Sequence, residues 1–253
     1  MSDALNVRAV LFDLYRTLID IWTNERHERV WRGLAGFLSY QDVRISPGDL
    51  SAGFFAGLAR QLRESREPYG EVDVTLAFQD ILTEAGHADP SGLAAATAGA
   101  FRTLSIVRFE LFPDVLPALG RLRPRFELAV ISDAQRAFFR PELAATGLAP
   151  LFRVAIASGE HGFHKPDPRL FAMALRRLGV PPEQAVYVGD SPDRDMRGAR
   201  AAGVRPVLLD RGGDLGAGLP DCPPDRIVRS LDALCDWLIP PGAGTGAGAG
   251  GRG

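Results

Sequence analysis

Residues 9–18 read AVLFDLYRTL, and this stretch decides the fold. Its first four residues, 9–12, are apolar and form the kind of run that is buried as a strand in a parallel sheet. The run ends on a carboxylate, Asp13, and Tyr15 and Thr17 follow it. Because ligands bind at the carboxyl ends of strands in open α/β sheets, Asp13 is the first candidate for a reacting group.

The composition of the whole chain limits the classes of protein to consider. Of its 253 residues, 46% are hydrophobic and 24% are charged, which suits one compact domain with an insert or two small domains. The net charge of −2 gives no reason to expect a nucleic acid or a membrane surface as a partner. Two cysteines predict no disulfide framework and a cytoplasmic location. We expect no signal peptide and no membrane-spanning segment.

Four further apolar runs predict strands that resemble the first. They cover residues 128–132, 154–157, 185–188 and 206–209. Helices are expected between them, at residues 113–122, 141–146, 168–178 and 195–202. Strands that alternate with helices indicate right-handed crossover units. The predicted fold class is therefore α/β, with a Rossmann-like, doubly wound parallel sheet.

One long segment interrupts this alternation. No convincing strand is visible between Leu18 and about Ile106, and the segment shows four amphipathic helical patterns instead. We expect residues 19–105 to form an α-helical cap with Phe54 and Phe55 in its packing. Residues 1–18 and 106–239 then form the core domain. The Gly/Ala-rich tail, residues 240–253, is expected to be disordered.

Polar side chains follow the other predicted strands, as Asp13 follows the first. They are Ser132 and Asp133 after the second strand, Lys165 in the loop HGFHKPDP, and Asp190, Ser191 and Asp195 after the fourth strand. A carboxylate such as Asp13 can act as a nucleophile or as a metal ligand, and further carboxylates supply the oxygen ligands that Mg²⁺ prefers. A hydroxyl and a lysine beside them can hold an anion. The pattern favours phosphoryl transfer, in which positioning and charge neutralisation supply most of the rate.

Four segments of the chain resemble the motifs of the haloacid dehalogenase (HAD) superfamily of hydrolases. LFDLYRTL is similar to the first motif, VISDA to the second, HKPDPRLF to the third and VGDSPDRDMRGARAAGV to the fourth. The similarity extends from about Arg8 to Leu209, and the helical insert corresponds to the helical cap of the family. All four motifs occur in the expected order on the expected strand ends, so the resemblance implies the HAD fold.

The resemblance also implies a role for each matching residue. Asp13 would be the nucleophile that forms a covalent aspartyl intermediate, Ser132 would bind the transferred group, and Lys165 would neutralise the developing charge. Asp13, Asp190 and the backbone carbonyl of Tyr15 would bind Mg²⁺, with Asp195 supporting them. Asp133, which stands where the family often has asparagine, would contribute to phosphate binding. Thr17 and Ser191 would support the structure of the site.

Tyr15 departs from the pattern of the phosphatases in this superfamily. Those enzymes usually carry an acid two residues after the nucleophile, which protonates the leaving alcohol and later activates water. Tyrosine is a poor general acid or base at neutral pH, because its ordinary pKa is about 10. The sequence FDLY is typical of the 2-haloacid dehalogenase branch, where the halide leaves without a proton. A substitute acid from the cap could be Asp20, Glu25, His27 or Tyr69, although none has a diagnostic motif around it.

The first motif is therefore dehalogenase-like. The fourth motif, GDSPDRD, is phosphatase-like, because it carries the two acids expected at the metal site, Asp190 and Asp195. We favour a Mg²⁺-dependent phosphatase that acts on a small phosphorylated metabolite. A metal-independent 2-haloacid dehalogenase and a non-catalytic binding protein with the same fold stay open as alternatives. His161 and His164 flank the lysine loop, but their spacing predicts no metal site. The sequence leaves the substrate and the oligomeric state open.

Overall fold

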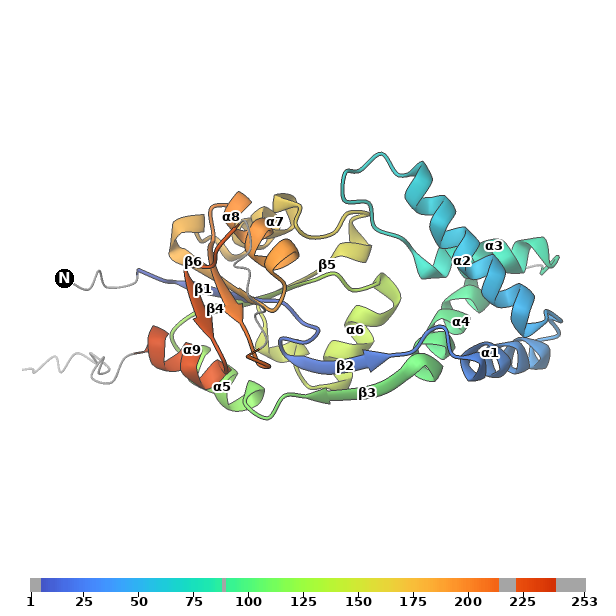
Figure 1. Ribbon diagram of the computed structural model, residues 1–253, viewed down its shortest axis with the longest axis horizontal. Coiled ribbons are helices and arrows are strands. Elements are labelled where there is room, and N and C mark those ends of the chain that lie inside the picture. Colours follow the sequence, from blue (N-terminus) through green and yellow to red (C-terminus); the bar gives the residue numbers. More distant parts are fainter. Residues whose placement is uncertain (1–5, 88–89, 214–221, 240–253) are drawn as a thin grey trace, which may run out of the picture.

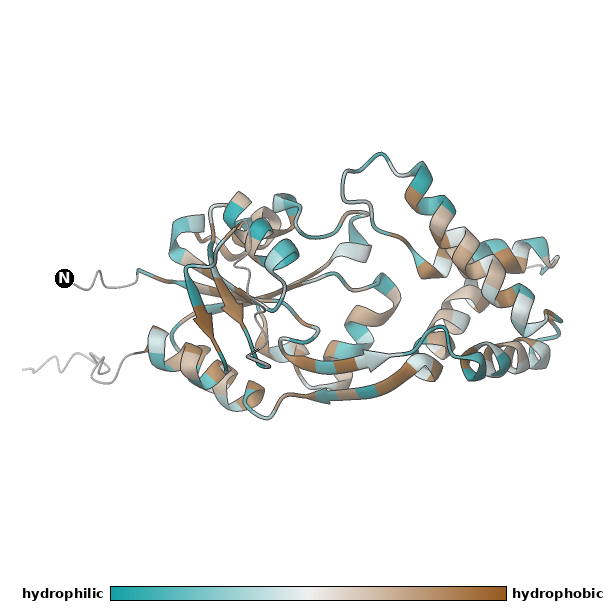
Figure 2. Cartoon of the chain, in the orientation of Figure 1, coloured by the Kyte–Doolittle hydropathy of each residue, from teal (hydrophilic) through white to brown (hydrophobic). Residues whose placement is uncertain are grey.

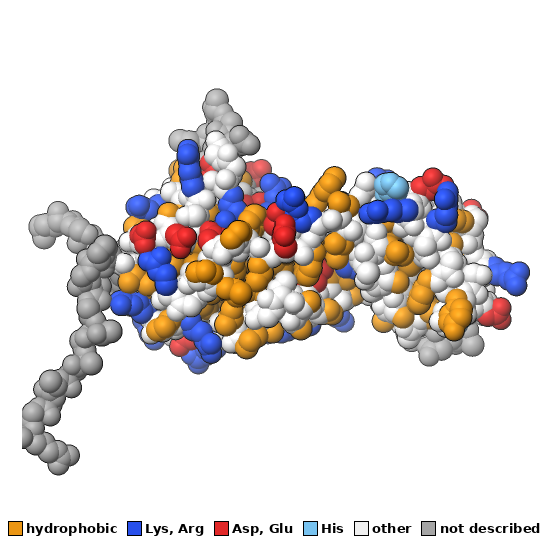
Figure 3. Space-filling view, turned by 90° about the horizontal axis from the view of Figure 1, so that it is seen from below, with side chains coloured by type: hydrophobic (Ala, Val, Ile, Leu, Met, Phe, Trp, Pro, Cys, Tyr) orange, Lys and Arg blue, Asp and Glu red, His pale blue; other side chains and the backbone are white. Residues whose placement is uncertain are grey.

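The computed structural model describes residues 6–87, 90–213 and 222–239. The predicted disordered tail, 240–253, lies outside these residues. Figure 1 shows a sheet with helices packed around it at one end of the molecule and a group of helices, α1 to α4, at the other. The space-filling view in Figure 3 shows these two parts as a larger and a smaller lobe, with positive and negative side chains interspersed on the visible face.

The main sheet has six strands, all parallel, in the order β5-β4-β1-β6-β7-β8. The strands are β1 (Ala9–Phe12), β4 (Glu127–Ser132), β5 (Val154–Ala157), β6 (Ala185–Gly189), β7 (Arg205–Leu209) and β8 (Arg226–Val228). The predicted α/β fold class is confirmed, and all five predicted strands are present; β8 is an additional strand that the sequence pattern did not indicate. Phe12 pairs with Val130 on one side and with Val188 on the other. The order of the strands thus switches at β1, where a doubly wound sheet binds its ligands.

Two layers of helices bury the sheet from opposite faces. The helices of the core are α5 (Val115–Leu122), α6 (Arg136–Ala145), α7 (Pro168–Leu178), α8 (Arg197–Ala201) and α9 (Leu231–Leu238). Side chains alternate across a strand, so Val10 and Phe12 pack with α5, α6 and α9, while Ala9 and Leu11 pack with α7 and α8. The strands of the sheet are accordingly among the most hydrophobic segments in Figure 2.

Two helix predictions need correction. The helix expected at 141–146 begins at Arg136, with Pro141 inside it. Proline usually marks a helix start, but here the preceding turn is held in place because Phe138 and Phe139 on it are buried. The helix expected at 195–202 is a π-helical turn, Pro192–Met196, followed by the short α8. Turns of this kind are frequent at functional sites.

The prediction that no strand lies between Leu18 and Ile106 was wrong. Strand β2 (Ile19–Thr23) pairs antiparallel with β3 (Ile106–Leu111), and this two-stranded ribbon connects the sheet to the four cap helices. A short strand whose partner strand lies some ninety residues away leaves a weak local signal. The division of the chain into core and cap at residues 18 and 106 stays our proposal.

The cap helices enclose an aromatic cluster of their own. They are α1 (Glu28–Tyr40), α2 (Pro47–Glu64), α3 (Val74–Glu84) and α4 (Pro90–Ser105). Phe54 is buried and lies in contact with Trp31, Phe78 and Phe101, which confirms its expected place in the cap packing. Its neighbour Phe55 is only partly buried. Within residues 6–87, 90–213 and 222–239, no helix is long and apolar enough to cross a membrane.

Candidate active site

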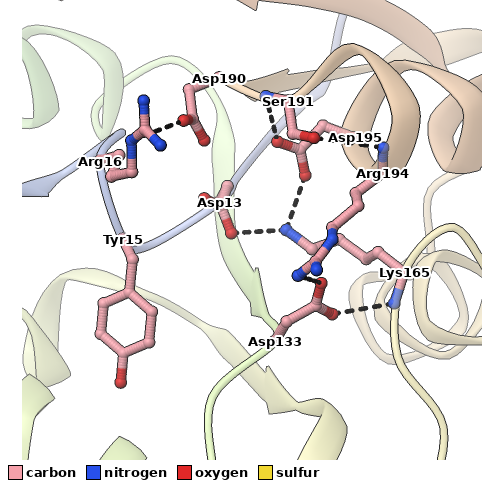
Figure 4. Close-up of a pocket in the computed structure, with 9 residues that line it drawn as sticks. All are labelled: Asp13, Tyr15, Arg16, Asp133, Lys165, Asp190, Ser191, Arg194 and Asp195. Atoms are coloured by element: carbon pink, nitrogen blue, oxygen red, sulfur yellow. Dashed lines mark hydrogen bonds and ion pairs between the residues drawn. The ribbon is translucent and has the colours of Figure 1, made fainter. Parts of the chain in front are cut away.

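A cavity of about 380 Å³ opens at the carboxyl ends of β1, β4 and β6. Its wall consists of Asp13, Tyr15, Arg16, Asp133, Lys165, Asp190, Ser191, Arg194 and Asp195. Seven of these nine residues were expected in the site from the sequence, and Arg16 and Arg194 were not. Figure 4 shows Asp13 and Asp195 directed at the end of the Lys165 side chain, while Asp190 lies beside Arg16. All nine residues come from the core, and none of the described cap residues forms part of the wall.

Lys165 joins two of the carboxylates. Its ammonium nitrogen lies 2.5 Å from Asp13 Oδ1 and 2.6 Å from Asp195 Oδ1, and it donates to the hydroxyl of Tyr187 at 3.0 Å. The side chain of Lys165 is only 3% exposed. Burial by itself would lower the pKa of Lys165, but the charges of Asp13 and Asp195 outweigh it, so this pKa is raised. Lys165 therefore stays protonated and neutralises the nucleophile candidate.

Three carboxylates form a compact oxygen cluster. Ligand atoms of Asp13, Asp190 and Asp195 all lie within 4.8 Å of one another. Burial raises the pKa of Asp13, its attraction to Lys165 lowers it, and the neighbouring carboxylates raise it further. Burial also raises the pKa of Asp190, followed in effect by the charge of Asp195. One lysine thus leaves excess negative charge in the cluster, and such a set of hard oxygen ligands fits Mg²⁺.

The loop after β6 places two of these acids. Asp195 lies in the π-helical turn, and its Oδ2 accepts a hydrogen bond of 2.9 Å from the backbone of Ser191. A Cβ atom on Gly189 would lie 2.4 Å from the Asp195 carboxylate, so only glycine fits at this position. Asp190 lies at the cavity surface, where Arg16 approaches its Oδ2 to 3.2 Å. The hydroxyl of Ser191 accepts a hydrogen bond of 3.3 Å from the backbone of Arg194, and its role in supporting the site stays a prediction.

Ser132 and Thr17 each present a buried hydroxyl that has no hydrogen-bond partner among the described residues. Ser132 ends β4. A buried hydroxyl without a partner is costly, and a ligand oxygen would satisfy it. The role of Ser132 in binding the transferred group stays a prediction that this geometry fits. Thr17 also holds the site through its backbone, since its carbonyl accepts from Arg211 Nη2 at 3.0 Å.

Asp133 contributes to the site through the lysine loop. Its Oδ1 accepts a hydrogen bond of 2.8 Å from the backbone of Lys165, and its Oδ2 lies 3.4 Å from Arg194. The carboxylate of Asp133 therefore holds the backbone of Lys165, the residue whose ammonium group contacts Asp13. Binding of phosphate by Asp133 itself stays a prediction, which would depend on Arg194 to offset the repulsion between anions.

The side chain of Tyr15 points away from Asp13 (Figure 4). Its hydroxyl donates to Glu142 Oε2 at 2.6 Å, and Arg102 Nε approaches Glu142 Oε1 to 2.6 Å. The guanidinium of Arg102 also lies 5.4 Å from the centre of the Tyr15 ring. Burial is the largest cause that raises the pKa of Tyr15 well above its ordinary value. The phenol is therefore part of a buried network between α6 and the cap helix α4.

Sequence reasoning did not identify Glu142, Arg102 or Tyr187. Glu142 stands three and four residues after the buried Phe139 and Phe138, so it lies on the same face of the helix. A charged residue on this otherwise apolar face was the signal that could have identified it. Tyr187 lies inside the β6 run, where its aromatic ring matches ordinary core packing. Arg102 shows no local signal, because its partners come from distant segments.

The histidines and the suggested cap acids lie outside the cavity wall. His164 Nδ1 contacts the carbonyl of Lys165, and the carboxylate cluster found among the described residues consists of Asp13, Asp190 and Asp195. Of the suggested cap residues, Asp20 pairs with Arg108 and His27 caps α1. Tyr69 lies beside His164, and Glu25 is likewise absent from the wall.

Comparison with known proteins agrees with this geometry. A family model for haloacid dehalogenase-like hydrolases matches residues 7–203. The chain is 43% identical over 155 residues to a phosphoserine phosphatase of Thermus thermophilus, which covers 61% of this chain and 60% of the relative. It is 33% identical to a plasmid-encoded phosphoglycolate phosphatase of Cupriavidus necator, over 94% of this chain and 95% of that enzyme.

A solved structure extends the comparison to the whole fold. The 2-haloacid dehalogenase from Pseudomonas syringae pv. Tomato superposes with a TM-score of 0.69 and 26% identity, covering 91% of this chain and 99% of the other. The residues matched by the family model include Asp13, Lys165 and Asp190. The chain therefore belongs to the haloacid dehalogenase-like hydrolases.

Proposed function

We propose that this protein is a Mg²⁺-dependent phosphatase that acts on a small phosphorylated metabolite through an aspartyl-phosphate on Asp13. The observation that carries the proposal is the convergence of Asp13, Asp190 and Asp195 within 4.8 Å around the ammonium of Lys165. The names of the similar enzymes, phosphoserine phosphatase and phosphoglycolate phosphatase, support a phosphate compound as the substrate. The chain matches only 60% of the length of the phosphoserine phosphatase, so we infer the activity of this protein from its own site and not from the name of that relative.

In this mechanism the carboxylate of Asp13 attacks phosphorus while Lys165 holds it in place. Asp13 is 6% exposed, and Lys165 lies on its Oδ1, so the other oxygen is the one available for attack. The unpartnered hydroxyl of Ser132 would donate to an oxygen of the transferred group. Preorganised charges and donors of this kind supply most of the acceleration in phosphoryl transfer.

The metal would be held by Asp13, Asp190 and the backbone carbonyl of Tyr15, with Asp195 in support. When bound, Mg²⁺ supplies positive charge that draws the phosphate into an acidic pocket and offsets charge in the transition state. Asp195 keeps this ligand set in place through its bond to the backbone of Ser191, and Arg16 orients Asp190.

The test is an activity screen of phosphate esters and haloacids, each with Mg²⁺ and with EDTA. The proposal expects turnover of phosphate compounds that needs Mg²⁺ and that Asp13→Asn abolishes. Asp193→Asn is the matched control, because Asp193 lies near the site with a side chain 83% exposed and outside the cavity wall. A protein that turns over none of the phosphate compounds under either condition would refute the proposal.

A 2-haloacid dehalogenase is the second candidate, and two observations favour it. Tyr15 replaces the second acid of the phosphatases, and the Pseudomonas dehalogenase shares the fold over nearly the whole chain. Against it stand Asp190 and Asp195, which make the pocket repel a free haloacid. Release of halide from 2-chloropropionate that persists in EDTA would identify this activity. Ligand binding without any turnover would identify the non-catalytic alternative.

Small-molecule phosphate esters are the expected partners, with no nucleic acid or membrane involved. A cytoplasmic location likewise stays our prediction from the sequence.

A further inference from the structure

We propose that Glu71, a residue of the cap, is a positioning residue for the reaction, because it holds in place the core loop that carries Lys165. This role rests on the proposed phosphatase function and adds to it a residue that stands outside the cavity wall formed by the described residues. Glu71 acts on the reacting groups through the core loops that it contacts.

The connection between α2 and α3, residues 65–73, reaches from the cap to the core. Residues 69–71 lie antiparallel to residues 162–164 of the core, and two backbone hydrogen bonds of 2.9 and 3.0 Å join them. Figure 1 shows this connection, in teal, beside the loop that follows β5. Because Lys165 is the next residue after this paired segment, the cap backbone is bonded to the loop directly before the ammonium candidate.

The side chain of Glu71 joins two core loops. Its Oε2 accepts a hydrogen bond from the hydroxyl of Ser158, and its Oε1 accepts one of 3.2 Å from Nε2 of Gln135. Ser158 is fully buried and begins the short turn η2 (Ser158–Glu160) after β5. Gln135 is the residue before α6, in the loop that follows β4. One carboxylate of the cap therefore holds the loops after β4 and β5 together.

Gln135 is bonded to the cap at both ends of its amide. Its nitrogen donates to Glu71, and its oxygen accepts a hydrogen bond of 3.1 Å from the backbone of Val74, the first residue of α3. A side-chain amide whose donor and acceptor are both engaged has a fixed orientation. The loop after β4 is thus attached to the cap at this one residue through two bonds.

Both contacts of the cap carboxylate lead to Lys165. Gln135 stands two residues after Asp133, whose Oδ1 accepts a hydrogen bond of 2.8 Å from the backbone of Lys165. Ser158 accepts a backbone hydrogen bond of 3.1 Å from Gly162, which lies three residues before Lys165. The backbone of Lys165 is therefore held from two directions, and each direction includes a partner of Glu71.

The reaction depends on where the Lys165 ammonium lies. Its nitrogen is 2.5 Å from Asp13 Oδ1 and 2.6 Å from Asp195 Oδ1. Replacing Glu71 with alanine removes the acceptor of a buried hydroxyl and of an amide, so the two loops lose the contact that joins them. A displacement of reacting groups by about 1 Å can cost about 10²-fold in rate.

Glu71→Ala is therefore expected to lower kcat for Mg²⁺-dependent hydrolysis of phenyl phosphate by about 10- to 10²-fold. KM is expected to change by less than about 3-fold, because an interaction that matters for the chemical step lowers kcat and kcat/KM together. A loss in kcat of less than about 3-fold would overturn the positioning role.

Glu71→Gln is the conservative variant that should restore the rate. Its amide oxygen accepts from Gln135, and its amide nitrogen donates to the hydroxyl of Ser158, which can accept as well as donate. Neither partner carries a charge, so the amide loses no ion pair with them. We expect kcat of Glu71→Gln to stay within about 3-fold of the natural protein. A variant as impaired as Glu71→Ala would overturn the inference, since the bonds would then not explain the loss.

Glu67→Ala is the matched control on the same connection. Glu67 also joins the cap to the core, through an ion pair with Arg169, but its side chain is 39% exposed. Exposed pairs contribute little, so kcat is expected to fall by less than about 3-fold. An equal loss in Glu67→Ala and Glu71→Ala would overturn the specific role of Glu71, because any weakened contact between cap and core would then have this effect.

A double variant tests whether Glu71 acts through Lys165. In the Lys165→Met background the ammonium is absent, so Glu71→Ala is expected to lower the remaining kcat by less than about 3-fold. A loss in that background as large as the loss in the natural protein would overturn this route.

Hydrogen exchange examines the same loop without any substrate. The backbone N–H groups of His164 and Lys165 donate to the carbonyl of Tyr69 and to Asp133. We expect both to exchange at least about 10-fold faster in Glu71→Ala and at the natural rate in Glu67→Ala. Unchanged exchange in Glu71→Ala would overturn the inference.

Circular dichroism and urea unfolding establish that each variant is folded. If Glu71→Ala does not fold, Ser158→Ala takes its place, because it removes the hydroxyl partner and leaves Glu71 in the cap. Ser158→Ala is expected to lower kcat by at least about 3-fold, and an unchanged kcat would overturn the inference.

The outcomes separate the two proposals. Full phosphatase activity in Glu71→Ala refutes the positioning role and leaves the phosphatase function standing. Absence of phosphate turnover in the natural protein refutes the phosphatase function, and the exchange of the two amides then decides whether Glu71 holds the loop.

Discussion

Replacing Arg102 with methionine tests how strongly the cap is joined to the core. Arg102 and Glu142 form an ion pair of 2.6 Å with side chains only 12% and 8% exposed. Arg102→Met removes the cation and leaves the Glu142 carboxylate buried, with the hydroxyl of Tyr15 as its remaining side-chain donor in the described structure. Removing one partner of such a pair costs about 3–5 kcal/mol. We expect the free energy of unfolding of Arg102→Met to fall by that amount.

The surface pair between Arg60 and Asp80 provides the matched control. Its atoms lie 2.5 Å apart, but its side chains are 43% and 47% exposed, and it joins α2 to α3 within the cap. Exposed pairs contribute about 0.2–1 kcal/mol, so Arg60→Met is expected to cost no more than that. Urea unfolding, followed by circular dichroism and by tryptophan fluorescence in parallel, measures both variants.

A double variant separates the pair from its burial. Arg102→Met combined with Glu142→Leu removes both charges and fills the space with apolar groups. Replacements of whole buried pairs are often neutral or stabilising, so the double variant is expected to recover most of the loss. If Arg102→Met costs less than about 1 kcal/mol, similar to the exposed pair, the reasoning about this buried network is refuted.

Three further predictions concern the site, the cysteines and the cap. Lys165→Met leaves Asp13 buried without its cation. We expect this variant to lower kcat for Mg²⁺-dependent hydrolysis of an aryl phosphate by about 10²-fold or more. A loss of less than about 10-fold would contradict the proposed role of Lys165. Burial raises the pKa of the Cys235 thiol to about 11, so the thiolate fraction of Cys235 and its rate of reaction with a thiol reagent should be low at pH 8 and rise only as the pH approaches that pKa. We expect the half-buried Cys222 to react first. Equal labelling of the two cysteines in the folded protein would contradict this expectation. Phe54→Ala leaves a cavity in the aromatic cluster of the cap, so we expect the free energy of unfolding measured in urea to fall by about 3–5 kcal/mol. A fall of less than about 1 kcal/mol would show that the cluster contributes little to stability.

Local patterns in the sequence were sufficient for five of the six strands of the main sheet and for much of the candidate site. A buried parallel strand is a continuous apolar run, so the strands ending near Asp13, Ser132 and Asp190 could be recognised without knowledge of their neighbours. The polar residues that follow those runs must meet at one edge, because parallel strands have their carboxyl ends on the same side. Six of the nine cavity residues were identified in this way, and Tyr15 was identified through the resemblance to the HAD motifs.

Contacts between distant segments could not be recognised in the same way. Strand β2 is stabilised by β3, which lies some ninety residues further along the chain, so its own five residues carried too little signal. The helix α6 begins before Pro141 because Phe138 and Phe139 pack against the cap and the core, which no local rule anticipates.

The sequence by itself determined the parallel sheet, its reactive edge and the nucleophile candidate Asp13, because periodicity and strand ends are local properties of the chain. Only the tertiary structure decided where the Tyr15 hydroxyl points. The phenol is bonded to Glu142 and, through it, to Arg102, residues 127 and 87 positions further along the chain. A side chain takes the direction in which its buried polar group finds a partner, and folding alone brings those partners together.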